Sequence, residues 1–297
     1  MLLASAARAQ LKPPSLKTFD ATGKVILNSI YTSPDPRPYW RTLSALDYRV
    51  PQEAKPYFLR CMAARRELMD ASSFGTIVDL GCSYGINSML LRFDLGIADL
   101  RWRYARLDMA LFGRDSLIAR DRRLKVCRDF LGVRFVGVDV SRQAAAYATE
   151  AGLLDDAVVA DLEQRSLKPD EVCRVADATL IISTGCFGYI TEASLTRILQ
   201  PCREQPWMVH SVLRMFDFAP AEEALARSGY VSSRSPQLLR QRRFDSRREQ
   251  ERILDRLCSM GIDPSGLESE GWLYAHIFLS RPASQADAAS LRRIFPC

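Results

Sequence analysis

The chain has 297 residues, of which 47% are hydrophobic, enough for one large domain with additions and a substantial core. No apolar run approaches the ~20 residues that cross a membrane, and residues 1–10 lack the features of a signal peptide. The eight cysteines show no C-x-x-C spacing and there are only two histidines, so we expect no metal site, reduced thiols and a cytoplasmic protein.

The net charge is +6, which raises the question of a nucleic-acid partner. Basic residues are nevertheless interleaved with acids, as in RDRRLKVCRD and QRRFDSRREQER. This pattern is typical of solvated helix faces. We therefore expect neither a nucleic-acid partner nor a membrane.

Residues 1–50 hold several prolines and a late aromatic cluster with little regular pattern, and we interpret them as an arm before a catalytic domain at 51–297. The arm is expected either to act as a lid, with its aromatics at the substrate, or to pack them on the domain surface. The aromatics in question are Tyr31, Tyr39 and Trp40. From Pro51 to Asp70 the apolar residues fall near one face, which predicts a helix.

The stretch TIVDLGCSYGIN, residues 76–87, predicts a strand, a tight turn and the start of a helix. Asp79 ends the strand, and glycines at 81 and 85 allow close approach of backbone and ligand. The N–H groups at the start of the helix suit a carboxylate or a phosphate.

This stretch resembles motif I of the class I S-adenosylmethionine (SAM)-dependent methyltransferases, D/E-x-G-x-G-x-G, with Ser83 at the middle glycine. The arm segment IYTSPDPRPYWRTLSALDYRVPQEAKPYF is also similar to the N-terminal part of a poorly characterised bacterial subfamily of these proteins. The resemblance implies an α/β, Rossmann-like class I methyltransferase fold: a seven-stranded, mostly parallel sheet with helices on both faces. It implies SAM as the cofactor, with the methionine part held by Asp79, Gly81, Ser83, Tyr84, Gly85 and Asn87.

The helix after this motif is predicted to end near Phe93, but the next strand, FVGVDVS, arrives later than the family pattern implies. Residues 94–132 are therefore an insertion, and two stretches within it are helical by periodicity. We expect the insertion to cover the substrate, or to add a scaffold or an element of a homodimer.

Asp139 ends the second strand, and Asp161 follows a short third strand at 157–160. The resemblance implies that Asp139, with Val140 beside it, holds the ribose of SAM. It further implies that Asp161 contacts the adenine amino group and that Leu162 donates its backbone N–H. A helix is predicted between these strands, at 142–151.

A fourth strand is predicted at 178–184, followed by the loop and helix GCFGYITEASLTRIL. Ligands of open α/β sheets bind beyond the carboxyl ends of the strands. We therefore place Ser183 and Thr184 at the cofactor, Cys186 and Phe187 at the substrate, and Tyr189 at the reacting centre.

The fifth strand, within 206–216, carries His210 and Arg214. His210 is either a general base or a satisfied core histidine. Arg214 pairs either with a substrate carboxylate or with a neighbouring acid.

The C-terminal part is predicted to hold a helix from Pro220 to Gly229, a strand within 237–244 and a last strand at 272–280. Between those two strands, Ser246 and Glu249 form a capping-box pattern that opens another helix.

The predicted function is methyl transfer from SAM to a small molecule, a metabolite or a natural product. The D/N-P-P-Y signature of nucleic-acid amino methyltransferases is missing. Three alternatives remain open: cyclisation of SAM to azetidine-2-carboxylate with release of methylthioadenosine, RNA methylation, and SAM binding without catalysis.

Overall fold

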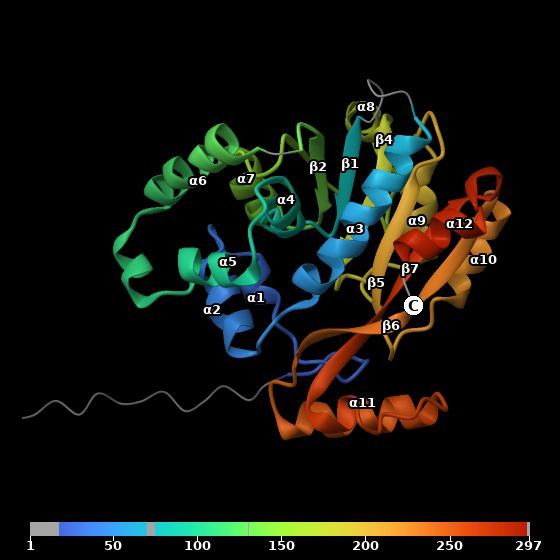
Figure 1. The fold of residues 1–297 in the computed structure, drawn as a ribbon. Helices are drawn as coiled ribbons and strands as arrows, with labels where there is room; N and C mark the ends of the chain where they lie inside the picture. Colours follow the sequence, from blue (N-terminus) through green and yellow to red (C-terminus); the bar gives the residue numbers. More distant parts are fainter. Residues whose placement is uncertain (1–17, 70–74, 130, 296–297) are drawn as a thin grey trace, which may run out of the picture.

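The computed structural model describes residues 18–69, 75–129 and 131–295, so the first 17 residues of the predicted arm lie outside the described residues. At its centre is one seven-stranded sheet in the order β3-β2-β1-β4-β5-β7-β6 (Figure 1). The strands are β1 (Thr76–Leu80), β2 (Arg134–Asp139), β3 (Asp156–Val159), β4 (Ala178–Thr184), β5 (Trp207–Leu213), β6 (Tyr230–Arg243) and β7 (Trp272–Pro282). The first five run parallel, and β7 is antiparallel to β5 and β6. This arrangement confirms the predicted Rossmann-like class I methyltransferase fold.

The central strands are nearly continuous apolar runs, which suits strands that are covered on both faces. Every residue of β1 and β5 is buried. Two hydrophobic clusters pack on the two faces of the sheet, and α3 crosses the near face in Figure 1. The near-face helices include α3 (Val50–Glu67), α4 (Ile86–Arg92) and α7 (Arg142–Glu150), and the far-face helices are α8 (Pro169–Val175), α9 (Glu192–Leu199) and α10 (Ala219–Arg227).

The arm is more regular than its sequence predicts, because it forms helices α1 (Asn28–Tyr31) and α2 (Arg37–Ala45). Pro38 lies in the first turn of α2, where a missing N–H breaks no hydrogen bond. Trp40 is fully buried, and the ring of Tyr39 packs edge-on against it. Tertiary packing therefore stabilises a helix that periodicity alone does not reveal.

The insertion folds as α5 (Ile97–Tyr104), the 3-10 helix η1 (Leu107–Leu111) and α6 (Arg114–Arg128). It lies beside the arm in Figure 1, and α5 contacts α2. The Arg37 guanidinium donates to the carbonyls of Met109 (2.7 Å) and Phe112 (2.8 Å). The insertion thus supports the arm.

In the C-terminal part, β6 is longer than the predicted strand at 237–244, and α11 (Arg247–Ser259) begins after Ser246. The Ser246 hydroxyl accepts the N–H of Glu249 at 3.3 Å, but the Glu249 carboxylate binds elsewhere, so the capping box is only half formed. Helices α8 and α12 (Ala288–Ile294) and the 3-10 helices η2 (Glu268–Glu270) and η3 (Ala283–Gln285) are additional elements. None of the helices in the described ranges combines the length and the apolar character needed to cross a membrane.

Candidate functional site

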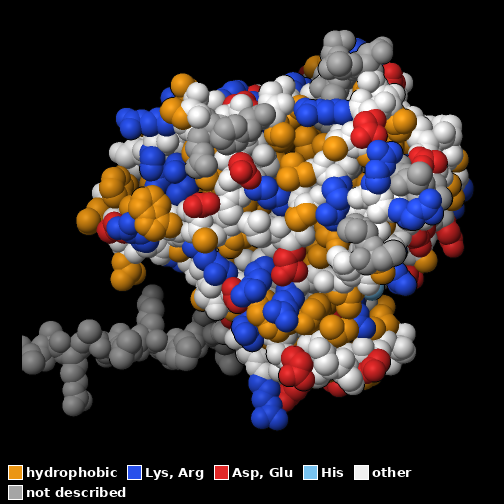
Figure 2. Space-filling model, in the orientation of Figure 1, with side chains coloured by type: hydrophobic (Ala, Val, Ile, Leu, Met, Phe, Trp, Pro, Cys, Tyr) orange, Lys and Arg blue, Asp and Glu red, His pale blue; other side chains and the backbone are white. Residues whose placement is uncertain are grey.

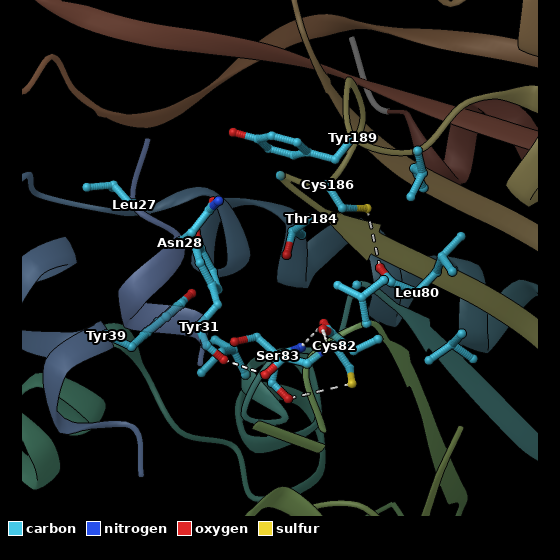
Figure 3. A pocket seen from close by; sticks show the side chains of 18 of the residues that line it. Leu27, Asn28, Tyr31, Tyr39, Leu80, Cys82, Ser83, Thr184, Cys186 and Tyr189 are labelled. Carbon is cyan, nitrogen blue, oxygen red and sulfur yellow. Dashed lines mark hydrogen bonds between the residues drawn. The ribbon is translucent and has the colours of Figure 1, made fainter. Parts of the chain in front are cut away.

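A cavity of about 800 Å³ opens at the carboxyl ends of the parallel strands (Figure 3). This volume lies in the range of roughly 300–1,000 Å³ that is typical of small-molecule sites. One side, which we call the sheet half, is lined by residues that end or follow β1, β2 and β3, among them Gly81, Cys82, Ser83, Asn87, Val138, Asp139, Val140, Ser141, Asp161 and Leu162. The rest of the lining, which we call the arm half, comes from the arm, the loop after β4 and β6, and consists of Lys24, Leu27, Asn28, Tyr31, Tyr39, Tyr48, Cys186, Tyr189, Gln241 and Arg242. Thr184 lies between the two halves.

The turn after β1 is fixed by close packing and by left-handed backbone. Gly81 has a φ of +73°, and a Cβ there would lie 2.7 Å from the Cβ of Cys186, so only glycine fits. Ser83 replaces the usual glycine of the motif and still adopts a φ of +48°, which strains a residue with a side chain. The buried Ser83 hydroxyl lines the cavity and has no hydrogen-bond partner among the described residues. It is therefore available to a ligand.

Asp139, at the end of β2, organises the sheet half. Its two carboxylate oxygens accept the backbone N–H groups of Ser83 and Ser141, each at 2.8 Å. Burial raises the pKa of Asp139, and backbone N–H groups, that of Ser141 foremost, oppose this shift. The Ser141 hydroxyl in turn donates to the carbonyl of Tyr31 at 2.5 Å. The carboxylate is thus held at the cavity by the motif turn, and its neighbour Ser141 reaches the arm.

Asp79 lies behind the cavity wall, whereas the sequence places it at the cofactor. It is fully buried, and one oxygen accepts the side-chain N–H of Asn87 at 2.8 Å. Asn87 and Thr184, which are hydrogen-bonded to each other at 3.2 Å, do line the cavity. Burial raises the pKa of Asp79 to about 7. The hydrogen bond from Asn87 lowers this pKa, and the negative charge of Asp139 raises it further. Asp79 therefore orients Asn87.

The residues after β3 form the far end of the sheet half. Asp161 is exposed, and one of its oxygens accepts the N–H of Glu163 at 2.9 Å. Leu162 is buried, and Val140, 67% exposed, lines the same region. The arrangement offers an acid and an apolar surface to a flat ligand.

Several predicted site residues do not line the cavity. Tyr84 is fully buried, and its hydroxyl donates to the carbonyls of Ile30 (3.0 Å) and Ser33 (2.8 Å), which joins the motif turn to the arm. The others in this group are Gly85, which precedes α4, and the buried residues Trp40, Ser183 and Phe187. These residues shape the site from behind.

His210 and Arg214 also lie away from the cavity. His210 is fully buried, its Nδ1 lies 2.8 Å from the Ser183 hydroxyl, and its ring packs on Phe187. Burial lowers the pKa of His210 to about 3, so the ring is neutral. Arg214 pairs with Glu268 at 2.5 Å. The structure therefore places His210 as a core histidine rather than a general base, and Arg214 with a neighbouring acid rather than a substrate.

Four residues predicted at the substrate or the reacting centre do line the arm half: Tyr31, Tyr39, Cys186 and Tyr189. Figure 3 shows Tyr189 above Thr184 and Cys186, across the cavity from Leu27 and Asn28. Burial raises the pKa of Tyr31 and of Cys186 to about 12, so both keep their protons at neutral pH. They can donate hydrogen bonds but cannot act as bases.

The sequence interpretation missed Lys24, Gln241 and Arg242, all of which line the arm half. A β-bulge in β6, where the register with β7 shifts between Arg240 and Arg242, buries two consecutive polar residues. The Arg242 guanidinium binds both oxygens of Glu249, at 2.7 and 2.9 Å. Polar residues are unusually frequent in the predicted strand QLLRQRRF, and this composition could have indicated that Gln241 and Arg242 face a cavity. No comparable feature of the sequence marks Lys24.

The insertion does not form the expected substrate cover. None of its described residues, 94–129 and 131–132, lines the cavity, whereas the arm contributes residues from Lys24 to Tyr48. Residues of the arm therefore line the cavity, and the insertion packs against the arm.

No family model matches the sequence, and a search of curated proteins finds no match. Among solved structures, the chain is similar to a TehB-like SAM-dependent methyltransferase from Corynebacterium glutamicum, with 15% identity over 72% of this chain and 86% of the other and a TM-score of 0.34. It is also similar to the plantazolicin methyltransferase BpumL in complex with SAH, with 12% identity over 86% and 97% of the two chains and a TM-score of 0.38. Both scores are low, so the fold is assigned from the strand order and the site from its own geometry.

Proposed function

We propose that this chain is a SAM-dependent methyltransferase that acts on a small-molecule acceptor. The observation that carries the proposal is Asp139, which lies at the end of β2 and faces the same cavity as the glycine-rich turn after β1. A carboxylate in this position can accept the two hydroxyls of a ribose. Asp161 and Leu162, one strand further along, offer an acceptor and an apolar surface to a base.

The residues present fit SAM. The unpartnered hydroxyl of Ser83 and the side chain of Asn87 would hold the methionine part, Asp139 the ribose, and Asp161 with Leu162 the adenine. SAM supplies a methyl group on a positively charged sulfur, so the protein need not provide an electrophile. The rings of the arm half would lie near that charge, which aromatic faces stabilise.

The chain's own contribution to the reaction is positioning and exclusion of water. Tyr31 and Cys186 keep their protons, and neutral His210 does not reach the cavity. The arm half therefore orients the acceptor beside the sheet half, and the arm, residues 1–50, acts as the lid on the domain at 51–297. An acceptor of metabolite size suits the cavity volume.

The molecular surface supports a small acceptor over a nucleic acid. On the face shown in Figure 2, Lys and Arg side chains are mixed with Asp and Glu and with hydrophobic groups, without one continuous basic patch. Many basic residues of the chain pair with acids at short distance, for example Arg114 with Glu150 and Arg203 with Asp177, each at 2.7 Å. A nucleic-acid surface would instead leave its cations free for phosphates.

The test is the identity of the products formed from SAM. Purified full-length chain is incubated with SAM, alone and with a fractionated metabolite extract, and the products are analysed by mass spectrometry. We expect S-adenosylhomocysteine only when an acceptor fraction is present. Methylthioadenosine formed without acceptor would replace the proposal by SAM cyclisation, and absence of SAM binding in calorimetry would refute it.

A further inference from the structure

Lys24 is a buried cation whose ammonium makes no direct ion pair with the described residues; the charges of Asp20 and Glu249 act on it only from a distance. Its side chain is 5% exposed and lines the arm half. Its Nζ lies 4.8 Å from the ring centre of Tyr189, and within the described ranges it makes neither a hydrogen bond nor an ion pair. Other buried cations differ: Arg65, Arg92 and Arg242 contact carboxylates at 3.6, 2.9 and 2.7 Å.

The acids around Lys24 are already committed to other donors. Asp20, on the same arm, accepts the backbone N–H groups of Thr22 and Lys24 and the Thr22 hydroxyl through Oδ1, and its Oδ2 accepts the Tyr189 hydroxyl at 3.4 Å. Glu249, on α11, accepts the Arg242 guanidinium and the N–H of Val25. Since a buried charge without a partner is costly, the site is incomplete as it stands.

The other groups that face Lys24 keep its charge near neutral pH. Burial, and then the charge of Arg242 on β6, lowers the pKa of Lys24 to about 8. Asp20, Glu249 and the Cys186 thiol of the loop after β4 oppose this shift. Lys24 is therefore mostly an ammonium at pH 7 and loses its charge above pH 8.

Gln241 is a second buried group that lacks a partner. It is 5% exposed and lines the same half of the cavity, and its side-chain carbonyl has no hydrogen-bond donor among the described residues. Arg242, next along β6, is held rigidly by Glu249. An ammonium, a fixed guanidinium and an unsatisfied amide thus line the arm half.

We propose that the arm half is an anion subsite, in which Lys24 pairs with a carboxylate or phosphate of the acceptor, while Arg242 remains paired with Glu249 and holds the wall in place. This inference rests on the proposed function, because it assigns the arm half to the acceptor. The acceptor is then an acidic small molecule, and a hydrogen-bond donor next to its anionic group satisfies Gln241. The ring of Tyr189, whose centre lies 4.8 Å from Nζ, adds a cation–π contact that helps to hold the ammonium at this wall.

The test is anion binding to the full chain saturated with S-adenosylhomocysteine, measured by calorimetry with benzoate and phenyl phosphate as probes and benzamide as the neutral control. We expect the better anion to bind at least about tenfold tighter than benzamide at pH 7, as a charge-assisted pair does. Lys24→Met removes that preference. The control Lys55→Met leaves it unchanged, because Lys55 lies outside the cavity and pairs with Asp94.

A pH series gives a second readout. The preference for the anion should fall by about tenfold for each pH unit well above the pKa of Lys24, which is about 8. Comparing benzoate with phenyl phosphate tells which anion the subsite takes. Equal affinity of benzamide and both anions, no anion binding up to roughly 10 mM, or a preference that survives in Lys24→Met each overturns the inference.

Failure of the anion subsite can be distinguished from failure of the proposed function. S-adenosylhomocysteine affinity is measured first, on the wild type and on Lys24→Met. Loss of that affinity in the wild type refutes the proposed function, whereas intact affinity without anion preference refutes only the anion subsite. Retained affinity in Lys24→Met also shows that this variant is folded.

Discussion

The sheet half and the arm half of the cavity differ in charge and in construction. The sheet half carries Asp139 and Asp161 at the ends of neighbouring parallel strands, so hydrogen bonding within the sheet fixes their positions. The arm half carries Lys24 and Arg242, which come from opposite ends of the sequence; Glu249 joins their segments, because it accepts the N–H of Val25, next to Lys24, and pairs with Arg242. The sheet half is built from neighbouring parallel strands, whereas the arm half combines the arm with β6 and the loop after β4.

Because of this difference, substitutions in the two halves should disturb different contacts. A change in the sheet half disturbs strand ends that every other element packs against. A change in the arm half disturbs one buried ion pair and a few arm contacts, while the sheet remains. Under the proposed function, recognition of the donor is thus tied to the strand ends, and recognition of the acceptor can vary with the arm and β6.

The largest expected effect comes from breaking the ion pair that holds the arm half together. Glu249→Gln leaves the Arg242 guanidinium buried without its carboxylate, and we expect the free energy of unfolding to fall by about 3–5 kcal/mol. Urea denaturation measures this loss. Glu251→Gln on the same helix is the matched control, since Glu251 forms only an exposed pair with Arg247, worth at most about 1 kcal/mol. Similar losses in both variants would contradict this role of Glu249.

An intermediate effect is expected in the sheet half. Asp139→Ala removes the acceptor of the Ser83 and Ser141 N–H groups and the proposed ribose contact, and we expect S-adenosylhomocysteine affinity to fall by about 1–3 kcal/mol. Isothermal titration calorimetry gives the number, with the exposed Asp177→Ala as control. Unchanged affinity in Asp139→Ala would remove Asp139 from the site.

The smallest expected effect tests whether the buried carboxylate of Asp79 lowers the stability of the folded protein at neutral pH. The pKa of Asp79, about 7, lies above that of an exposed carboxyl, so the folded state binds its proton more tightly than the unfolded state. Stability from this group is therefore present at pH 4 and is lost as the pH rises toward 7. Asp79→Asn keeps an acceptor for Asn87 without the buried charge, and we expect it to raise the Tm at pH 8 by at least about 2 °C, with less change at pH 4. Parallel pH–Tm curves for the two proteins would show that Asp79 does not titrate in this way.

The sheet and its ligand-facing end could be predicted because they depend on local pattern. Each parallel strand of the centre is a short apolar run, and Asp79, Asp139 and Asp161 mark strand ends that meet at one edge of the sheet. These patterns can be recognised in the sequence without knowledge of tertiary contacts. Asp79 shows the limit of such patterns. It was predicted to contact the ligand, but it is buried behind Asn87 and orients that side chain instead.

The arm half could not be predicted, because its chemistry arises from tertiary burial. Lys24 is one of many basic residues in the sequence, and only its position beneath Tyr189 distinguishes it. Gln241 and Arg242 face inward together because of a bulge that strand alternation does not foresee. His210 illustrates the converse error. It stands out in the sequence because the chain has only two histidines, but the side chain is fully buried away from the cavity.

The hydroxyls of Tyr84 and Ser141 fasten the arm to the sheet half. They donate to the carbonyls of Ile30, Ser33 and Tyr31, in the arm segment that contributes Tyr31 and Thr32 to the cavity wall. At about 0.5–1.5 kcal/mol for each hydrogen bond, this segment is lifted only in a minor fraction of molecules. With the arm as the proposed lid, S-adenosylhomocysteine would leave only through that opening. Its release, rather than the transfer itself, would then limit turnover, and the first cycle would show a burst of product.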